Sequence, residues 1–230
     1  MTLTEFEQHT GITFKNKNIL QQAFIHRSYI NENPRTNLHH NERLEFLGDA
    51  VLELVVTEFL YTKYPNHNEG DLTAYRSALV NAVTLGEVAT ELSFNDMMRL
   101  SKGEAKDLTR ARSSILADAY EAYIGAVYLD QGYDTTRDFI VRTVLVKTEE
   151  IIEKGLYKDA KSFVQEKAQD IYGLTPSYKV LSEEGPDHDK LFTVAICFGS
   201  DEISRGEGKS KQEAETEAAK NALKKKGWEK

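Results

Sequence analysis

The chain has 230 residues, of which 40% are hydrophobic and 29% charged, and its formal net charge is −8. This composition is typical of one large globular domain or two smaller ones. The single cysteine, Cys197, excludes an internal disulfide framework and a zinc site built from cysteines. The sequence shows no secretion-signal pattern and no apolar run of membrane-spanning length. We therefore expect a cytoplasmic protein without membrane contacts.

The acidic excess lies in the first two thirds of the chain. Residues 1–153 contain 15 Lys and Arg against 23 Asp and Glu, whereas residues 154–230 contain 14 of each kind. Six lysines gather late in the second part, namely Lys209, Lys211, Lys220, Lys224, Lys225 and Lys226. This local basic patch is a candidate contact for nucleic acid despite the negative total.

The first forty residues predict two helices and a loop. A capping box at Thr4–Glu7 opens a short helix, residues 18–29 form an amphipathic helix, and the polar residues 31–40 form a loop. Three histidines lie in or near this loop: His26, His39 and His40. Histidines near loops are more often structural or solvated than ligands, so we do not include them in a site.

Residues 41–61 predict a long buried helix, because the segment is largely apolar and contains no proline. Glu42, Glu45 and Asp49 recur at the spacing of one helix face. Burying an unpaired carboxylate is costly, so three acids on one face without a basic partner indicate a divalent cation.

The ordinary alternative for such acids is a solvated face. Two features argue against it in this segment. The helix is too apolar to lie on the surface, and Gly48 removes a side chain where a partner could approach. Asn41, just before the acids, is a suitable N-cap.

A second acid-bearing helix follows further along the chain. Residues 71–92 predict an intervening helix, with Glu69 in the turn before it. Residues 113–130 then predict another apolar helix that carries Asp118 and Glu121 three residues apart. Two buried helices that both carry acids are harder to explain by surface solvation than either alone.

A further helix is predicted to run from Asp134 to about residue 153. No strand pattern occurs up to this point, so the sequence predicts an all-helical first domain over residues 1–153.

The pattern changes after a short linker at residues 154–158. Residues 157–171 predict a helix that extends back into this linker. Alternating strands follow at 177–181, 191–198 and 202–207, and a last helix begins near Ser210. The order α-β-β-β-α predicts a small α+β domain with one three-stranded antiparallel sheet over residues 159–228.

These segments resemble the bacterial ribonuclease III family over essentially the whole chain. HNERLEFLGDAVL (40–52) is similar to the signature segment of that family, NEGDLTAYRSALVN (68–81) to its middle segment, and LADAYEAYIGAVYLD (116–130) to its second acidic helix. The second part resembles a double-stranded RNA-binding domain, with GPDH (185–188) between two strands and GKSKQEAETEAAKNAL (208–223) at the last helix. One departure is Ala50, where the family commonly has serine.

The resemblance implies a homodimeric endonuclease that hydrolyses double-stranded RNA with Mg²⁺, for which Mn²⁺ could substitute. It implies 5′-phosphate ends, short 3′ overhangs and a role in processing ribosomal and other structured RNA precursors. The implied metal ligands are Glu45, Asp49, Asp118 and Glu121. Asp49 and Glu121 are also expected to be catalytic, together with Glu42 and Glu69.

The resemblance also implies contacts with RNA and with a second subunit. The candidate RNA contacts are Gln165, Glu166, His188, Lys209, Ser210 and Lys211. Phe46 matches the aromatic residue that reaches into the partner, although an ordinary core phenylalanine is equally consistent with the sequence.

Two other functions remain open at this point. The chain could be an RNA-binding module whose helical domain only dimerises, but such a scaffold would not need six acids at the family positions. It could instead be a helical phosphohydrolase for small nucleotides, which would leave the α-β-β-β-α domain unexplained.

Overall fold

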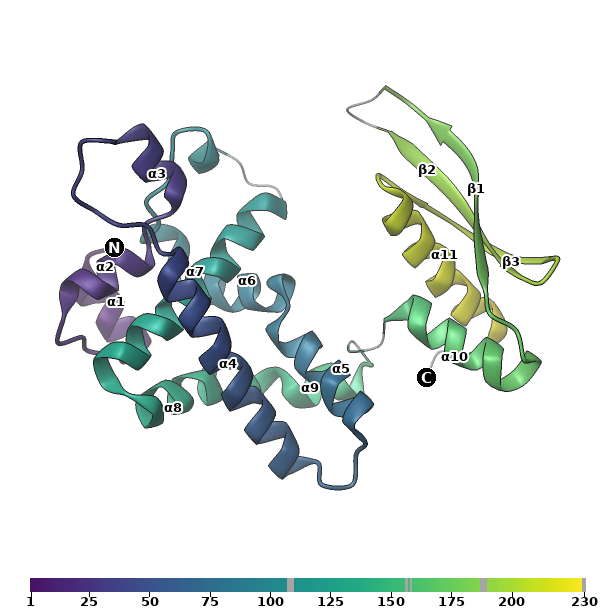
Figure 1. Cartoon of the computed structure of the whole chain (residues 1–230), viewed down its shortest axis with the longest axis horizontal. Helices are drawn as coiled ribbons and strands as arrows, with labels where there is room; N and C mark the ends of the chain where they lie inside the picture. The colour runs from purple at the N-terminus through teal and green to yellow at the C-terminus, as the bar shows by residue number, and fades with distance from the viewer. Residues whose placement is uncertain (107–109, 156, 158, 187–189, 229–230) are drawn as a thin grey trace. The chain divides into compact units, whose positions relative to one another are not determined.

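The computed structural model describes residues 1–228 apart from 107–109, 156, 158 and 187–189. The chain forms two compact units, Met1–Tyr157 and Lys158–Lys230 (Figure 1). Each unit has a hydrophobic core of its own.

The first unit is built from helices. In chain order they are α1 (Leu3–Thr10), α2 (Lys17–Ala23), α3 (Arg27–Glu32), α4 (Glu42–Lys63), α5 (Glu69–Val80), α6 (Ala82–Glu91), α7 (Arg110–Gln131), α8 (Tyr133–Thr143) and α9 (Thr148–Glu153). Shorter 3-10 turns are η1 (Phe94–Asp96), η2 (Glu104–Lys106) and η3 (Leu145–Lys147). Within the described part of this unit, the only β-type pairing is an isolated bridge between Ile25 and Arg99. The predicted all-helical fold is therefore confirmed.

Helices α4 and α7 cross at two glycines in the centre of this unit. A Cβ atom on Gly48 would lie 1.7 Å from the backbone oxygen of Glu121, and one on Gly125 would lie 2.2 Å from the backbone oxygen of Leu44. Both distances are far shorter than van der Waals contact, so only glycine fits at these positions. The close crossing places the first turns of α4 beside the middle of α7.

Aromatic side chains pack the core around this crossing. Phe6 of α1 contacts Phe24 and Phe94 edge-on, with ring centroids 5.0 and 5.4 Å away. Tyr123 of α7 joins the same cluster, 5.6 Å from Phe6. These contacts fix α7 to the helices that surround it.

Three segments predicted to be single helices are divided in the structure. Residues 71–92 form α5 and α6, because the side chain of Asn81 accepts hydrogen bonds from the amides of Val83 and Thr84 and starts a new helix. Residues 18–29 are shared between α2 and α3, and residues 134–153 between α8, η3 and α9. These predictions were wrong because apolar periodicity continues across a local cap or turn.

Two predicted caps also differ. Asn41 precedes α4 but makes no side-chain cap; instead its side chain donates a hydrogen bond to the backbone oxygen of Ala23. The first capping box is formed by Thr2 and Glu5 rather than within Thr4–Glu7. A buried tertiary partner thus takes the Asn41 side chain away from its helix.

Helix α4 is buried on one face only, which corrects the prediction of a buried helix. Leu52 and Val56 lie in the core, whereas Phe46, Leu54 and Tyr61 on the opposite face are exposed. The acids of α4 therefore lie near the boundary of an exposed apolar face.

The second unit contains α10 (Ala160–Tyr172), β1 (Ser177–Glu184), β2 (Leu191–Phe198), β3 (Asp201–Gly208) and α11 (Lys211–Lys226). The strands form an antiparallel sheet in the order β1-β2-β3, and both helices lie on one of its faces (Figure 1). The predicted α-β-β-β-α order and three-stranded sheet are confirmed.

Small residues bring α11 close to this sheet. A Cβ atom on Gly206 of β3 would lie 2.1 Å from the backbone nitrogen of Ala218. Ala214, Ala218 and Ala222 of α11 are fully buried against the sheet side of the unit. Cys197 is a buried free thiol of β2.

In the part of the chain that the structure describes, no helix is both long and apolar enough to span a membrane.

Candidate active site

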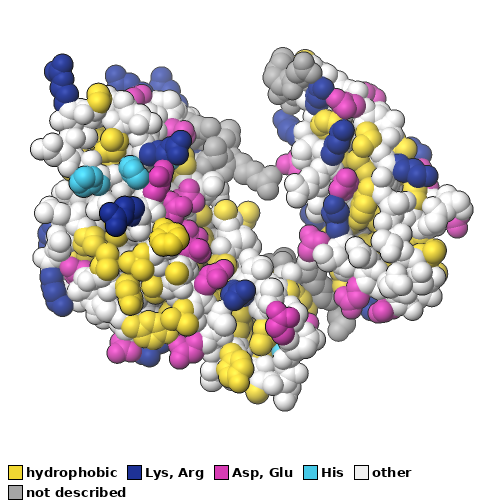
Figure 2. Space-filling model, viewed as in Figure 1, with side chains coloured by type: hydrophobic (Ala, Val, Ile, Leu, Met, Phe, Trp, Pro, Cys, Tyr) yellow, Lys and Arg dark blue, Asp and Glu magenta, His cyan; other side chains and the backbone are white. Residues whose placement is uncertain are grey.

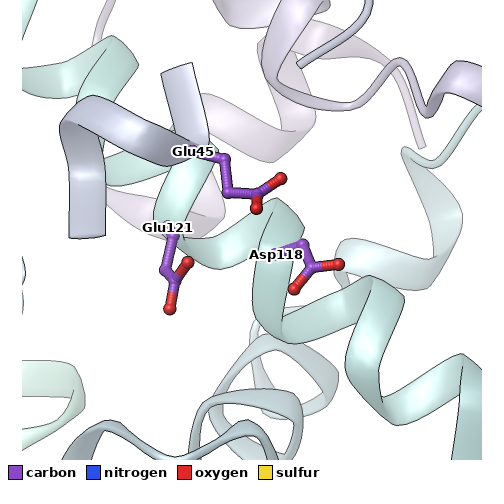
Figure 3. A group of neighbouring side chains, drawn as sticks. All are labelled: Glu45, Asp118 and Glu121. Carbon is purple, nitrogen blue, oxygen red and sulfur yellow. The ribbon is translucent and has the colours of Figure 1, made fainter. Parts of the chain in front are cut away.

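Three carboxylates from two helices meet beside the α4–α7 crossing. Glu45 lies in the first turns of α4, and Asp118 and Glu121 lie one turn apart on α7 (Figure 3). One oxygen from each of these side chains lies within 4.8 Å of the others. The glycine contact between the helices allows this approach, because it removes the side chains that would hold them apart. We call Glu45, Asp118 and Glu121 the acid triad.

The acid triad concentrates negative charge in a half-buried place. Burial, followed by repulsion from the neighbouring acids, raises the pKa of Glu45 to about 7 and that of Glu121 to about 8. Burial also raises the pKa of Asp118. No described residue forms an ion pair or a hydrogen bond with these three carboxylates.

This donor set fits a divalent cation. Carboxylate oxygens are the ligands that hard cations such as Mg²⁺ prefer, and such sites usually leave room for water and phosphate. A cation would favour the charged carboxylates, which burial and, for Glu45 and Glu121, repulsion from neighbouring acids make costly. Half-buried side chains can hold it while one side of the site stays open to a substrate.

Asp49 lies one turn after Glu45 on α4, but it is exposed and outside the acid triad. Its charge nevertheless contributes to the raised pKa of Glu45 and Glu121. Asp49 is therefore electrostatically part of the site, although the structure brings together only three of the four predicted ligands.

The two remaining candidate acids have other partners. Glu42 faces Arg27, with 3.4 Å between Oε1 and Nη1, and His40, with 3.7 Å between Oε2 and Nδ1. Glu69 is the first residue of α5, is exposed, and accepts a hydrogen bond from the hydroxyl of Thr73 at 3.1 Å. Neither belongs to the acid triad.

No sequence pattern indicated that Arg27 and His26 lie near this site. Arg27 reaches Glu42 across fifteen residues. His26 is the N-cap of α3 and is half-buried; burial lowers its pKa, while the charges of Glu104 and Asp118 act in the opposite direction. Both residues lie at the start of α3, and no spacing rule relates them to the acids of α4 and α7.

The candidate RNA contacts lie on α10 and at the start of α11 in the second unit. Gln165 and Glu166 are exposed on α10. Ser210 caps α11 by accepting a hydrogen bond from the amide of Glu213, and Lys211 is the first residue of that helix. Lys209 precedes the cap and is exposed. His188 lies outside the described residues.

Phe46 has 83% of its surface exposed. It therefore does not belong to the core of its own unit, which removes the ordinary core explanation. Figure 2 shows acidic side chains in a band near α4, with a broad hydrophobic patch on the same face of this unit. The acids and the exposed apolar face are thus close neighbours.

Comparison with protein families gives two matches that together span most of the chain. Residues 16–148 match the family described as Ribonuclease-III-like. Residues 160–226 match the double-stranded RNA binding motif. The first match contains all six candidate acids and the second contains all six candidate RNA contacts.

Curated relatives cover nearly the whole chain. Ribonuclease 3 of Borreliella burgdorferi is 43% identical over 222 residues, which are 96% of this chain and 90% of the relative. Ribonuclease 3 of Bacillus cytotoxicus is 45% identical over 223 residues, which are 96% of this chain and 89% of the relative.

A solved structure resembles part of the chain. It is the nuclease domain of ribonuclease III from Campylobacter jejuni, described as flexible in the region involved in dimer formation. The match has 38% identity and a TM-score of 0.57, and it covers 62% of this chain and 96% of that domain.

Proposed function

The chain belongs to the ribonuclease III family, and we propose that it is an endonuclease that hydrolyses phosphodiester bonds in double-stranded RNA with bound divalent cations. The observation that carries this proposal is the acid triad, which has no described cationic partner, in a chain that also contains a double-stranded RNA binding motif. Either feature alone would fit a wider range of functions.

Glu45, Asp118 and Glu121 would hold the cation, with Asp49 as the fourth ligand from the exposed side. Mg²⁺ is the proposed cofactor and Mn²⁺ its substitute, because both take oxygen ligands. When bound, such a cation offsets the charge of the phosphodiester and makes water a better nucleophile at neutral pH.

Glu42 and Glu69 have supporting roles in this proposal. Both are away from the acid triad and accessible to solvent, so they suit contacts with water or with RNA groups near the scissile bond. Glu42 also holds Arg27. The positive charge of Arg27 favours the approach of a phosphate that the acids would otherwise repel.

The second unit supplies the attraction for RNA. Domains of this type read the shape of an A-form duplex through phosphates and 2′-hydroxyls over about 16 base pairs. We assign Gln165, Glu166 and His188 to the minor-groove side. The segment Lys209–Lys211 suits a phosphate, because lysine charge and the start of α11 act in the same direction.

The active form is proposed to be a homodimer through the exposed face of α4. Phe46, Leu54 and Tyr61 lie on this face, and burial against a second copy would remove them from water. Each subunit would cut one strand. Water would attack phosphorus and the 3′-oxygen would leave with a proton, so the 5′ end keeps the phosphate, and cuts offset between the strands leave short 3′ overhangs.

The biological setting follows from this assignment. The proposed substrates are ribosomal and other structured RNA precursors in the cytoplasm. The proposed domains are residues 1–153 for catalysis and 159–228 for RNA binding, joined by residues 154–158.

Cleavage of a long RNA duplex in Mg²⁺ tests the function. We expect the wild type to cut, and Glu121→Gln to bind the duplex but to cut it at least ~100-fold more slowly, since one cation ligand loses its charge. Glu87→Gln, which removes an exposed acid of α6, is the matched control and should cut normally. If the wild type binds the duplex but never cuts it, the chain is a binding module and the proposal fails.

A further inference from the structure

A polar hollow of about 310 Å³ lies in the second unit among α10, β1 and α11. Its lining includes Lys161 and Gln165 from α10, Tyr178 from β1 and Gln212 from α11. Gln165 and the start of α11 are both among the proposed RNA contacts. The hollow therefore lies between two elements that would face the same duplex.

Lys161 at this hollow is neutralised by an internal partner. Its Nζ lies 2.5 Å from Oε2 of Glu215 on α11 and 5.0 Å from the ring centroid of Tyr178. The side chains of Lys161 and Glu215 remain 33% and 28% exposed. The pair is therefore within reach of solvent and of a ligand at the surface.

The Tyr178 hydroxyl beside this pair is buried and makes no hydrogen bond with any described residue. Burial, followed by the charges of Glu215 and Asp159, raises its pKa to about 12, so the hydroxyl keeps its proton at neutral pH. A buried polar group without a partner is costly. A ligand with oxygen atoms that entered the hollow would remove this cost.

We propose that Lys161 is a further phosphate contact for double-stranded RNA, and that Glu215 competes with the RNA for it and so limits affinity. This inference rests on the proposed function, because it takes the second unit to bind duplex RNA. It adds an internal ion pair that weakens the binding of RNA by the second unit. An enzyme that must release its cut products benefits from such a limit.

The energetics allow a duplex to compete with Glu215. An ion pair whose side chains are partly exposed is screened by water, so it adds only modestly to stability. A duplex presents many phosphates, and each neutralised phosphate releases counterions. A phosphate can therefore replace Glu215 as the partner of Lys161, at the cost of the ion pair and of repulsion from the displaced carboxylate.

Two charge-neutralising substitutions on the same helix separate this effect from a general change in charge. Glu215→Gln frees Lys161. Glu217→Gln, two residues further on, removes the same charge but leaves the Lys161–Glu215 pair intact, because Glu217 pairs with Lys220 at 3.7 Å. Thermal unfolding of both variants shows whether they are folded.

Binding of the full-length variants to an RNA duplex is measured over a range of salt concentrations without divalent cations, so that no cleavage occurs. We expect Glu215→Gln to bind about three- to tenfold more tightly than Glu217→Gln. The slope of log K against log salt should be steeper by roughly 0.9, which corresponds to one more phosphate contact. The double variant Lys161→Gln/Glu215→Gln should lose this gain.

Equal affinities and slopes for the two single variants would overturn the inference and leave the ion pair as a link between α10 and α11. A gain that persists in the double variant would also overturn it, because Lys161 would not be its source. If the wild type binds no duplex at all, the proposed function fails as well. The control variant and the wild type thus separate the two failures.

Discussion

At the scale of single residues, the site is defined by carboxylates that the fold holds together against their mutual repulsion. Burial, and then this repulsion, raises the pKa of Glu45 and Glu121. An isolated acid on a helix surface would not show it. The acid triad is thus prepared for a cation before any cation binds, and its electrostatic cost is part of the stability of the protein.

This cost predicts how stability without divalent cations depends on pH. The pKa of each group is raised from an ordinary value of 4.5, so its contribution to stability is full below about 4.5. The contribution is lost as the pH rises through about 7 for Glu45 and about 8 for Glu121. We expect the Tm in a chelator to fall from about pH 5 to about pH 8.5, and Glu121→Gln to reduce this fall.

Differential scanning calorimetry with and without Mg²⁺ measures this effect. Mg²⁺ should restore the Tm of the wild type at the alkaline end of this range and have less effect on Glu121→Gln. The control Glu87→Gln should follow the wild type. A Glu121→Gln profile that coincides with the wild type would show that the charge of Glu121 has no cost in the folded state.

At the scale of elements, the decisive feature is the crossing of α4 and α7. The acids lie on both helices, and the distance between the helices decides whether the carboxylates can share a cation. Gly48 and Gly125 set that distance, because each lies against the backbone of the other helix. The glycines are thus as necessary to the site as the acids.

Gly48→Ala is expected to disrupt this crossing. The added Cβ atom would lie 1.7 Å from the backbone oxygen of Glu121, which a side-chain rotation cannot relieve. We expect a loss of more than about 3 kcal/mol in the free energy of unfolding, measured by urea denaturation. Cation binding should weaken in any fraction that remains folded.

Gly103→Ala is the matched control for this substitution. A Cβ atom there would have its nearest neighbour 3.9 Å away, at the hydroxyl of Ser101. Its effect on stability should stay within about 0.5 kcal/mol. Similar losses for Gly48→Ala and Gly103→Ala would show that the crossing tolerates a side chain.

At the scale of the whole molecule, the acid triad and the double-stranded RNA binding motif lie in different units of the chain. The first unit carries the excess of acids, and the second carries the late lysines and the double-stranded RNA binding motif. An acidic centre that must approach a polyanion gains from an attached domain that binds the same duplex. The exposed face of α4 is the proposed surface for a second copy.

Leu54→Glu is expected to disrupt the proposed dimer. Leu54 is 57% exposed on α4, so a glutamate there is tolerated by the monomer but would be costly in an apolar interface. Val83→Glu is the control, since Val83 is 55% exposed on α6, away from that face.

Light scattering after size-exclusion chromatography measures the mass of each variant. The wild type and Val83→Glu should have the mass of a dimer, and Leu54→Glu that of a monomer. A dimeric Leu54→Glu would place the interface elsewhere.

The sequence alone determined the fold class and, for the second part of the chain, the order of elements. The long apolar segment that carries Glu42, Glu45 and Asp49 could be recognised because helical periodicity is a local property of the chain. The α-β-β-β-α order of the second part was equally visible in its alternating strands and turns. The acids indicated the class of chemistry by their residue type, because carboxylate oxygens are the preferred ligands of hard divalent cations.

Only the tertiary structure decided which of these acids meet. Glu45, Asp118 and Glu121 form the acid triad because two helices distant in sequence cross at glycines, whereas Asp49 and Glu69 are exposed and Glu42 pairs with Arg27. The breaks between helices, the exposed face of α4 and the Lys161–Glu215 pair likewise depend on partners far along the chain. Spacing along one helix fixes which side chains share a face, but a second element decides what that face touches.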